Sequence, residues 1–242
     1  MIQVKDNSAL NGIMVINKPS GITSHDVVDC LRRRLNVRRV GHSGTLDPLA
    51  TGVLVMLVGR ATKLFNQFVA YDKGYRAKIL LGKKTDTADI QGEVLEEKPA
   101  DFVTKEKVEE VLSQFLGETE QIPPMYSAIK HKGKKLYELA RKGVVVDRAP
   151  RKIRIDVLKL LEFEPPEFKI YVECSKGTYV RKLAEDIGEK LGTAACIAKI
   201  ERTKVGPFHI DEAVSLEDAG SGDLRRWQGN GDLWKSCADS PS

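Results

Sequence analysis

The feature that most restricts the fold is a glycine-punctuated segment that runs directly into a wholly apolar one. Gly41, Gly44 and Gly52 interrupt residues 41–52, and residues 53–58 (VLVMLV) form the longest uninterrupted apolar run of the chain. Six apolar residues suit a strand buried on both faces, whereas a membrane-spanning helix needs about 20. We therefore expect residues 41–52 to form a loop held against the core of a globular domain.

Hydrophobic periodicity outlines the other elements. Helical spacing predicts helices that begin at Thr23 or Ser24 and near Thr104, and further helices over 60–70 and 178–191. Alternation and β-rich composition predict strands over 12–17, 53–58, 74–81, 152–163 and 167–174, with the last two as a hairpin around Pro165-Pro166. Strands outnumber helices without a regular βαβ alternation. This favours an α+β fold with a mixed, mainly antiparallel central sheet flanked by helices.

Composition excludes several classes of protein. Of the 242 residues, 41% are hydrophobic and 30% are charged, which is typical of an ordinary globular chain. The start MIQVKDNSAL lacks the apolar core of a secretory signal, so we expect a cytoplasmic protein. The four cysteines and four histidines are scattered without metal-ligand spacing, and neither a zinc site nor a disulfide framework is predicted.

The positive charge is concentrated in two places. Residues 119–154 carry ten lysines and arginines against three acidic residues, and residues 32–39 carry five arginines with no acidic residue. Basic patches attract phosphate backbones through counterion release, so nucleic acid is the favoured partner class. The alternative from charge alone is a solvated helix face and a mobile basic loop.

Asp47 is the first candidate for chemistry. It lies between Gly44 and Gly52, and Pro48 pushes its backbone toward an extended conformation that aims the carboxylate. Such a loop can bring a substrate close. The alternative is an ordinary turn-forming Asp-Pro pair.

Arg181 and Tyr75 are the other candidates. Arg181 falls in the first turn of the 178–191 helix, where the helix dipole disfavours a cation, so an anion should lie near it. That anion is a carboxylate such as Asp47 or a nucleic-acid phosphate. The alternative is that Arg181 lies on the surface and points into solvent. Tyr75 is either a core residue of its strand or a platform on which a base stacks.

The sequence Asp86–Asp89 lacks the spacing of an EF-hand and is interpreted as an acidic turn.

Several motifs then agree, in order, with one known family. The segment GHSGTLDPLATG at 41–52 closely resembles the catalytic motif of the TruB family of tRNA pseudouridine synthases. The same family is matched by NKPSG at 17–21, DKGY at 72–75, GKKTDTAD at 82–89, CSKGTYVR at 174–181 and IERT at 200–203. The resemblance covers about residues 12–217, and so many ordered motifs make a chance match improbable.

The resemblance implies an enzyme that isomerises uridine 55 in the T arm of tRNA by base flipping, without metal or cofactor. It implies the pseudouridine synthase fold as well. Carried over position by position, Asp47 is the catalytic carboxylate and Arg181 is its ion-pair partner. Tyr75 stacks on the target base and assists in proton removal.

The resemblance also implies a set of substrate-binding positions. Ile200 lines the pocket, and His42 inserts into the T loop where the flipped bases were. The other implied positions are Lys18 and Pro19, which support the active-site loop, together with Tyr179, Lys130 and Lys132. Residues 119–152 resemble the mobile thumb that closes over the RNA.

The expected organisation is one catalytic domain over residues 1–218 and a short tail over 219–242, rich in Gly, Ser and Asp and poorly ordered. Many family members continue into an RNA-binding module of the PUA type, for which 24 residues are too few. We expect a monomer. Two alternatives stay open, namely a non-catalytic tRNA-binding folding helper and a hydrolase that releases free uracil.

Overall fold

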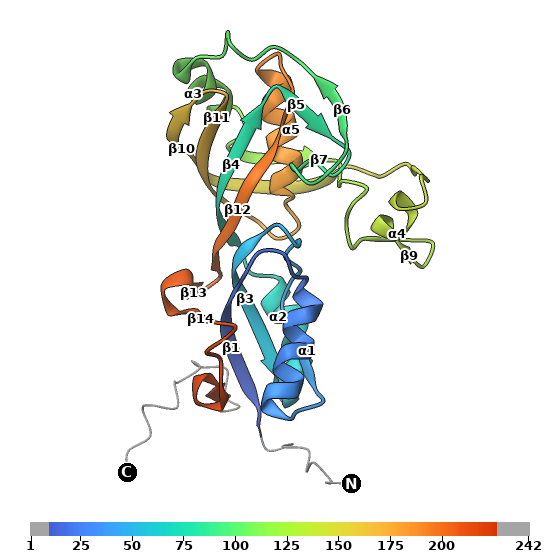
Figure 1. Cartoon of the computed structure of the whole chain (residues 1–242), viewed down its shortest axis with the longest axis vertical. Coiled ribbons are helices and arrows are strands. Elements are labelled where there is room, and N and C mark those ends of the chain that lie inside the picture. Colours follow the sequence, from blue (N-terminus) through green and yellow to red (C-terminus); the bar gives the residue numbers. More distant parts are fainter. Residues whose placement is uncertain (1–9, 227–242) are drawn as a thin grey trace. The chain divides into compact units, whose positions relative to one another are not determined.

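The computed structural model describes residues 10–226. The chain divides into two compact units: unit 1 is Met1–Gly74 with Glu201–Ser242, and unit 2 is Tyr75–Ile200. Figure 1 traces both units in chain order. Strands β4 (Lys73–Leu81) and β12 (Ala195–Val205) are the two elements in which the chain passes from one unit to the other.

Unit 1 is built on β3, the strand predicted from the apolar run. Strand β3 (Thr51–Val58) lies antiparallel to β1 (Gly12–Lys18), from Gly12 opposite Val58 to Lys18 opposite Gly52, and parallel to β12. The strand order is β14-β1-β3-β12. The remaining strands of the unit are β2 (Val40–His42), β13 (Phe208–His209), β14 (Val214–Ser215) and β15 (Arg225–Arg226).

The core of unit 1 forms on one face of β1 and β3, where Ile13 and Val15 contribute apolar side chains from β1. Val53, Val55 and Leu57 pack with Phe68 and Phe208, whose rings stack at 5.9 Å between centroids. Leu54, Met56 and Val58 are buried as well, as expected for a strand covered on both faces.

Helix α1 (Ser24–Leu35) begins where the sequence predicts. Thr23 is its N-cap, and a reciprocal capping box joins Thr23 and Asp26, which satisfies two backbone donors at the helix start. Asn36 ends the helix in the left-handed conformation. The apolar stripe of α1 is buried, and Arg33 and Arg34 are exposed.

The predicted helix over 60–70 is only partly correct. The chain forms a 3-10 turn, η1 (Gly59–Leu64), followed by the short helix α2 (Phe65–Val69). The Thr62 hydroxyl donates to the Gly59 carbonyl three residues earlier at 2.8 Å, and neither segment has a side-chain cap. This local bond favours the tighter turn over a regular helix.

Unit 2 contains a sheet in the order β12-β4-β11-β10-β7. Strands β10 (Arg151–Glu164) and β11 (Glu167–Cys174) form the predicted hairpin, and β7 (Gly117–Gln121) pairs antiparallel with β10. Helix α3 (Lys105–Ser113) contacts β10 and helix α5 (Val180–Lys190). The other elements are β5 (Lys83–Thr85), β6 (Val94–Glu97), β8 (Lys130–His131), β9 (Lys134–Lys135) and α4 (Leu136–Ala140).

The predicted C-terminal tail is partly structured. Strand β15 pairs with β1, Leu224 is buried, and Arg225 forms an ion pair with Glu212 at 2.6 Å. The remaining elements here are η2 (Ile210–Glu212) and η3 (Ser221–Asp223). The expectation of a poorly ordered tail is therefore wrong for residues 219–226, and residues 227–242 lie outside the described part.

Candidate active site

In unit 1, Ser24 at the start of helix α1 holds the loop that carries Asp47. Asp47 is half-buried between β2 and β3. The buried Ser24 hydroxyl accepts from the Leu46 amide at 2.8 Å and donates to the Leu46 carbonyl at 3.1 Å. The backbone immediately before Asp47 is therefore fixed at both of its polar groups, so the direction of the carboxylate is constrained.

The turn at residues 18–22 holds the loop on the other side of Asp47. The Pro48 carbonyl accepts from the Gly21 amide at 2.8 Å and from Lys18 Nζ at 3.4 Å. Lys18 is fully buried, and its ammonium also donates to the carbonyls of Pro19 at 2.8 Å and Ile22 at 2.7 Å. Lys18 and Pro19 thus lie next to the loop that they are predicted to support.

A third anchor reaches the loop from β12. Arg202 is buried, and its guanidinium donates to the carbonyls of Val53, Gly44 and Thr45. Arg202 also pairs with Gly52 in the parallel β3–β12 ladder. Gly52 has φ +99, and a Cβ there would lie 2.2 Å from the Arg202 carbonyl oxygen, so only glycine allows this approach.

The charges around the loop shift two ionisable groups. Burial lowers the pKa of Lys18 from 10.5 to about 8; the Asp47 carboxylate opposes the shift, and Arg202 adds to it. Burial, together with Arg202, lowers the pKa of His42 as well. His42 is therefore neutral at pH 7, and its Nδ1 accepts from the Gly44 amide at 3.3 Å.

In unit 2, Arg181 has the anionic neighbour that its position predicts. Only 6% of Arg181 is exposed, so the alternative of a surface arginine in solvent is wrong. Its guanidinium lies 3.9 Å from the buried Asp89 carboxylate and donates to the carbonyls of Tyr126, at 2.9 Å, and Thr87. Thr87 and Asp89 belong to the predicted acidic turn. The pairing of Arg181 with Asp47 stays a prediction.

The remaining predicted residues of unit 2 lie on four elements. Tyr179 caps α5 and exchanges two hydrogen bonds with the Gln121 side chain, at 2.8 and 3.2 Å. Tyr75 on β4 and Ile200 on β12 are both half-buried. Lys130 and Lys132 are exposed on the β8–β9 hairpin, where amines can meet phosphates.

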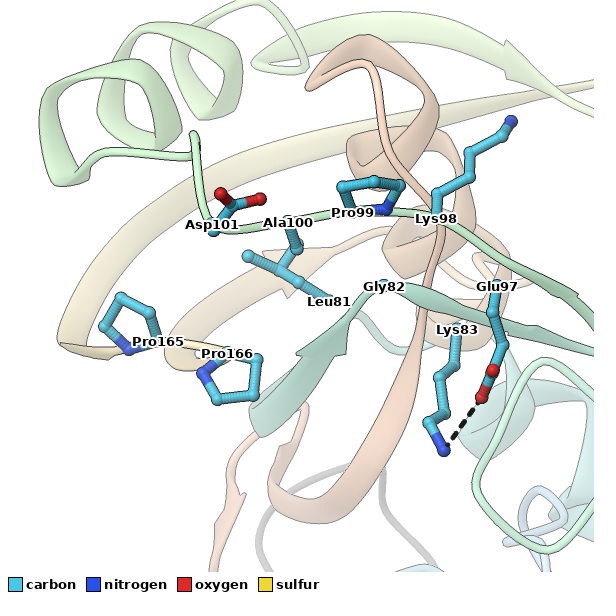
Figure 2. Close-up of a pocket in the computed structure, with 10 residues that line it drawn as sticks. All are labelled: Leu81, Gly82, Lys83, Glu97, Lys98, Pro99, Ala100, Asp101, Pro165 and Pro166. Carbon is cyan, nitrogen blue, oxygen red and sulfur yellow. Dashed lines mark ion pairs between the residues drawn. The ribbon is translucent and has the colours of Figure 1, made fainter.

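A separate pocket in unit 2 is drawn in Figure 2. Its volume is about 670 Å³, and none of the predicted site residues lines it. The dashed line in Figure 2 marks the Lys83–Glu97 ion pair, at 3.1 Å, on the wall of this pocket. The other lining residues are Leu81, Gly82, Lys98, Pro99, Ala100, Asp101, Pro165 and Pro166.

Two absences hold for the described part of the chain. Between residues 10 and 226, no group of three or more His, Cys, Asp or Glu side chains is placed to hold a metal ion. The helices in this range are also too short or too polar to traverse a lipid bilayer.

Comparison with known families decides the class of the chain. Residues 32–180 match the family described as TruB family pseudouridylate synthase, N-terminal domain, and residues 181–221 match the tRNA pseudouridylate synthase B C-terminal domain. The chain belongs to the TruB family. It is therefore an isomerase that forms pseudouridine in tRNA, and the motif resemblance is confirmed.

Curated TruB relatives are similar over most of the chain. The tRNA pseudouridine synthase B of Syntrophotalea carbinolica is 48% identical over 208 residues, which cover 86% of this chain and 68% of the relative. The protein of the same name from Pseudomonas fluorescens is 48% identical and covers 90% and 72%. That from Bordetella parapertussis is 46% identical and covers 86% of each chain.

Solved structures agree with the predicted fold class. A chain in the crystal structure of a Cbf5-Nop10-Gar1 complex has a TM-score of 0.68 at 28% identity and covers 89% of this chain. A chain in the structure of an H/ACA RNP bound to a substrate RNA containing 2'-deoxyuridine has a TM-score of 0.64 at 26% identity. This chain spans 55% and 51% of the lengths of those two chains. The α+β pseudouridine synthase fold is confirmed.

Sequence reasoning missed two residues that hold the Asp47 loop in this TruB protein. Ser24 looked only like a helix cap, because its partner Leu46 lies 22 residues later. Arg202 lies in the IERT motif, and its partners Gly44 and Thr45 lie 158 and 157 residues earlier. The segment that forms β12 (ACIAKIERTKV) carries four charged residues, so its own pattern does not single out Arg202 as a buried one.

The lowered pKa of Lys18 predicts a specific pH dependence of stability. The unfolded chain holds this proton up to about pH 10.5 and the folded chain only up to about pH 8. The unfolded state therefore binds more protons between these values, so the unfolding free energy should rise with pH across this window, by at most about 3 kcal/mol.

Urea unfolding of the wild-type chain and Lys18→Met at several pH values from 7 to 10.5 measures this effect. The difference between the two proteins should shift in favour of wild type as the pH rises. A difference that stays constant would contradict the prediction.

Proposed function

We propose that this TruB protein isomerises uridine 55 in the T arm of tRNA, with Asp47 as the catalytic carboxylate and without metal or cofactor. The observation that carries the proposal is the loop in the family's catalytic motif, which three buried side chains hold around Asp47. Such anchoring pre-organises a reacting group and reduces the cost of orienting it in the transition state. The name of the P. fluorescens relative supports tRNA as the substrate.

The chemistry requires one bond to break and another to form at the same ribose carbon. The bond from C1′ to N1 of uracil breaks, the base turns, and C5 bonds to C1′. C5 then loses a proton, and N1, which kept the electron pair of the broken bond, gains one. The Asp47 carboxylate can attack C1′ or C6 covalently, or it can take the C2′ proton so that a glycal forms. Each of these routes uses an ionised carboxylate.

The other proposed roles follow the same assignment. Arg181 pairs with Asp47 and keeps it ionised, and Tyr75 stacks on the base and assists in proton removal. Tyr179 and Ile200 line the pocket, which excludes water that would intercept the intermediate.

We propose that the RNA is held mainly through its phosphates. Flipping the uridine costs a few kcal/mol, which contacts elsewhere on the RNA must offset. His42, neutral and next to the loop, fills the space that the flipped bases leave. Lys130 and Lys132 contact the backbone from the thumb, residues 119–152, and Arg33, Arg38 and Arg39 present exposed cations in unit 1. We further propose a monomer that acts in the cytoplasm.

An RNA assay tests the proposal and separates it from the alternatives. Unmodified tRNA transcript and a matching transcript with cytidine at position 55 are incubated with the chain, and pseudouridine is mapped chemically. Modification at position 55 of the first transcript alone is expected. Binding without modification would indicate a folding helper, and released uracil would indicate an N-glycoside hydrolase.

A further inference from the structure

Arg202 is a buried cation that donates hydrogen bonds to backbone carbonyls of the Asp47 loop and of the start of β3. The residue is 2% exposed. Nε donates to the Val53 carbonyl at 2.7 Å, Nη2 to that of Gly44 at 3.2 Å, and Nη1 to that of Thr45 at 3.5 Å. The three acceptors lie on both sides of Asp47 in sequence, so one planar group ties the two ends of the loop together.

A guanidinium is better suited than any other side-chain group to tie the two ends of the Asp47 loop together. Burying a cation is costly unless its donors are satisfied, so an apolar residue would be the simpler choice at this position of β12. Arginine presents several donors in one rigid plane, whereas lysine is a flexible point charge. The position of the planar guanidinium is itself fixed, because Arg202 pairs with Gly52 in the β3–β12 ladder and Gly52 has no Cβ to hold the two strands apart.

We propose that Arg202 is a positioning residue, which sets the direction of the Asp47 carboxylate by clamping the carbonyls of Gly44, Thr45 and Val53. This inference rests on the proposed function, because it requires Asp47 to be the catalytic group. Arg202 acts through the loop backbone. Its charge also reaches Lys18 and His42, whose pKa values it lowers.

The test uses Arg202→Lys and Arg202→Ala in the full chain. For each variant, the single-turnover rate with saturating enzyme, the tRNA dissociation constant and the melting temperature are measured. Arg202→Lys keeps the positive charge but loses the rigid, planar set of hydrogen-bond donors. We expect its rate to fall about a hundredfold, because a displacement of about 1 Å at a reacting group is sufficient for such a loss, while the dissociation constant stays within about threefold.

Rescue of the reaction rate by added guanidinium ion distinguishes a positioning role of Arg202 from a merely structural one. Added at low millimolar concentration, below the denaturing range, it should raise the rate of Arg202→Ala several-fold and leave wild type unchanged. Arg225→Ala is the matched control, since it removes another arginine of unit 1 that pairs with Glu212. Its rate should equal that of wild type and show no guanidinium response.

Each outcome decides the proposal. A wild-type rate in Arg202→Lys would overturn it, as would a rate loss in Arg202→Ala that guanidinium leaves unchanged. If Arg202→Ala does not fold, the rate of Arg202→Lys alone decides. Asp47→Asn is run in parallel: activity in that variant would overturn the proposed function, whereas an inactive Asp47→Asn beside a fully active Arg202→Lys would overturn only the role of Arg202.

Discussion

Asp47→Asn is expected to lower the single-turnover rate of pseudouridine formation by at least about a thousandfold while tRNA binding stays within about threefold of wild type. Asparagine has nearly the same shape as aspartate, so the loop bonds made by Ser24 and Arg202 to backbone groups should persist. An amide is neither a nucleophile nor a base at neutral pH, so every proposed route through the carboxylate is lost.

The measurement combines chemical mapping of pseudouridine under single-turnover conditions with filter binding of the same transcript. Asp211→Asn serves as the control, because Asp211 is an exposed carboxylate of unit 1 outside the proposed site. Substantial activity in Asp47→Asn would contradict the assignment. Loss of tRNA binding in step with activity would show that Asp47 holds the substrate instead of reacting with it.

The second large effect concerns Arg181. Arg181→Met should lower the unfolding free energy by about 3 kcal/mol, because it leaves the buried Asp89 carboxylate and the carbonyls of Thr87 and Tyr126 without the group that now faces them. In a chain of this size, the corresponding fall in melting temperature is roughly 6 to 12 °C. If Arg181 also pairs with Asp47, the reaction rate should fall as well.

A double-mutant cycle with Asp89→Asn isolates the buried pair, and we expect a coupling of about 1 to 3 kcal/mol in thermal or urea unfolding. Lys182→Met is the matched control on the same helix. Its ion pairs with Glu185 and Asp186 join neighbouring turns, so its loss should cost less than about 1 kcal/mol. Equal effects of Arg181→Met and Lys182→Met would contradict the importance of the buried pair.

Local patterns in the sequence were sufficient for most of the helices and strands. A capping residue at Thr23 or Ser24 followed by helical spacing predicts the start of α1, and alternation predicts β4, because both signals depend only on near neighbours. Strand β7 carries the polar sequence GETEQ with four of its five residues outside the core, so nothing in its own pattern distinguishes it from a loop. Its pairing with β10 defines it.

In the candidate site, too, sequence reasoning found the residues of local motifs and missed partners that lie far apart in the chain. The motif predicted Asp47 and its flanking turn, but not Asp89 as the carboxylate beside Arg181, which lies 92 residues earlier in the chain. Such partners are chosen by tertiary pairing, and a single sequence carries no distance information between them. The prediction for residues 60–70 was partly wrong for a different reason: the first part of this segment, GRATKL, forms a 3-10 turn in which the Thr62 hydroxyl donates to the Gly59 carbonyl.

The place of Arg202 in the chain has a consequence for synthesis on the ribosome. Unit 2 is one continuous segment, whereas unit 1 needs residues 201 onward to finish its sheet. Thr45 emerges 157 residues ahead of the guanidinium that binds its carbonyl. At 5 to 20 residues per second, this delay is roughly 8 to 30 s. During this interval the Asp47 loop of the nascent chain lacks its Arg202 anchor, and of the three anchors only Ser24 and Lys18 are available to hold it.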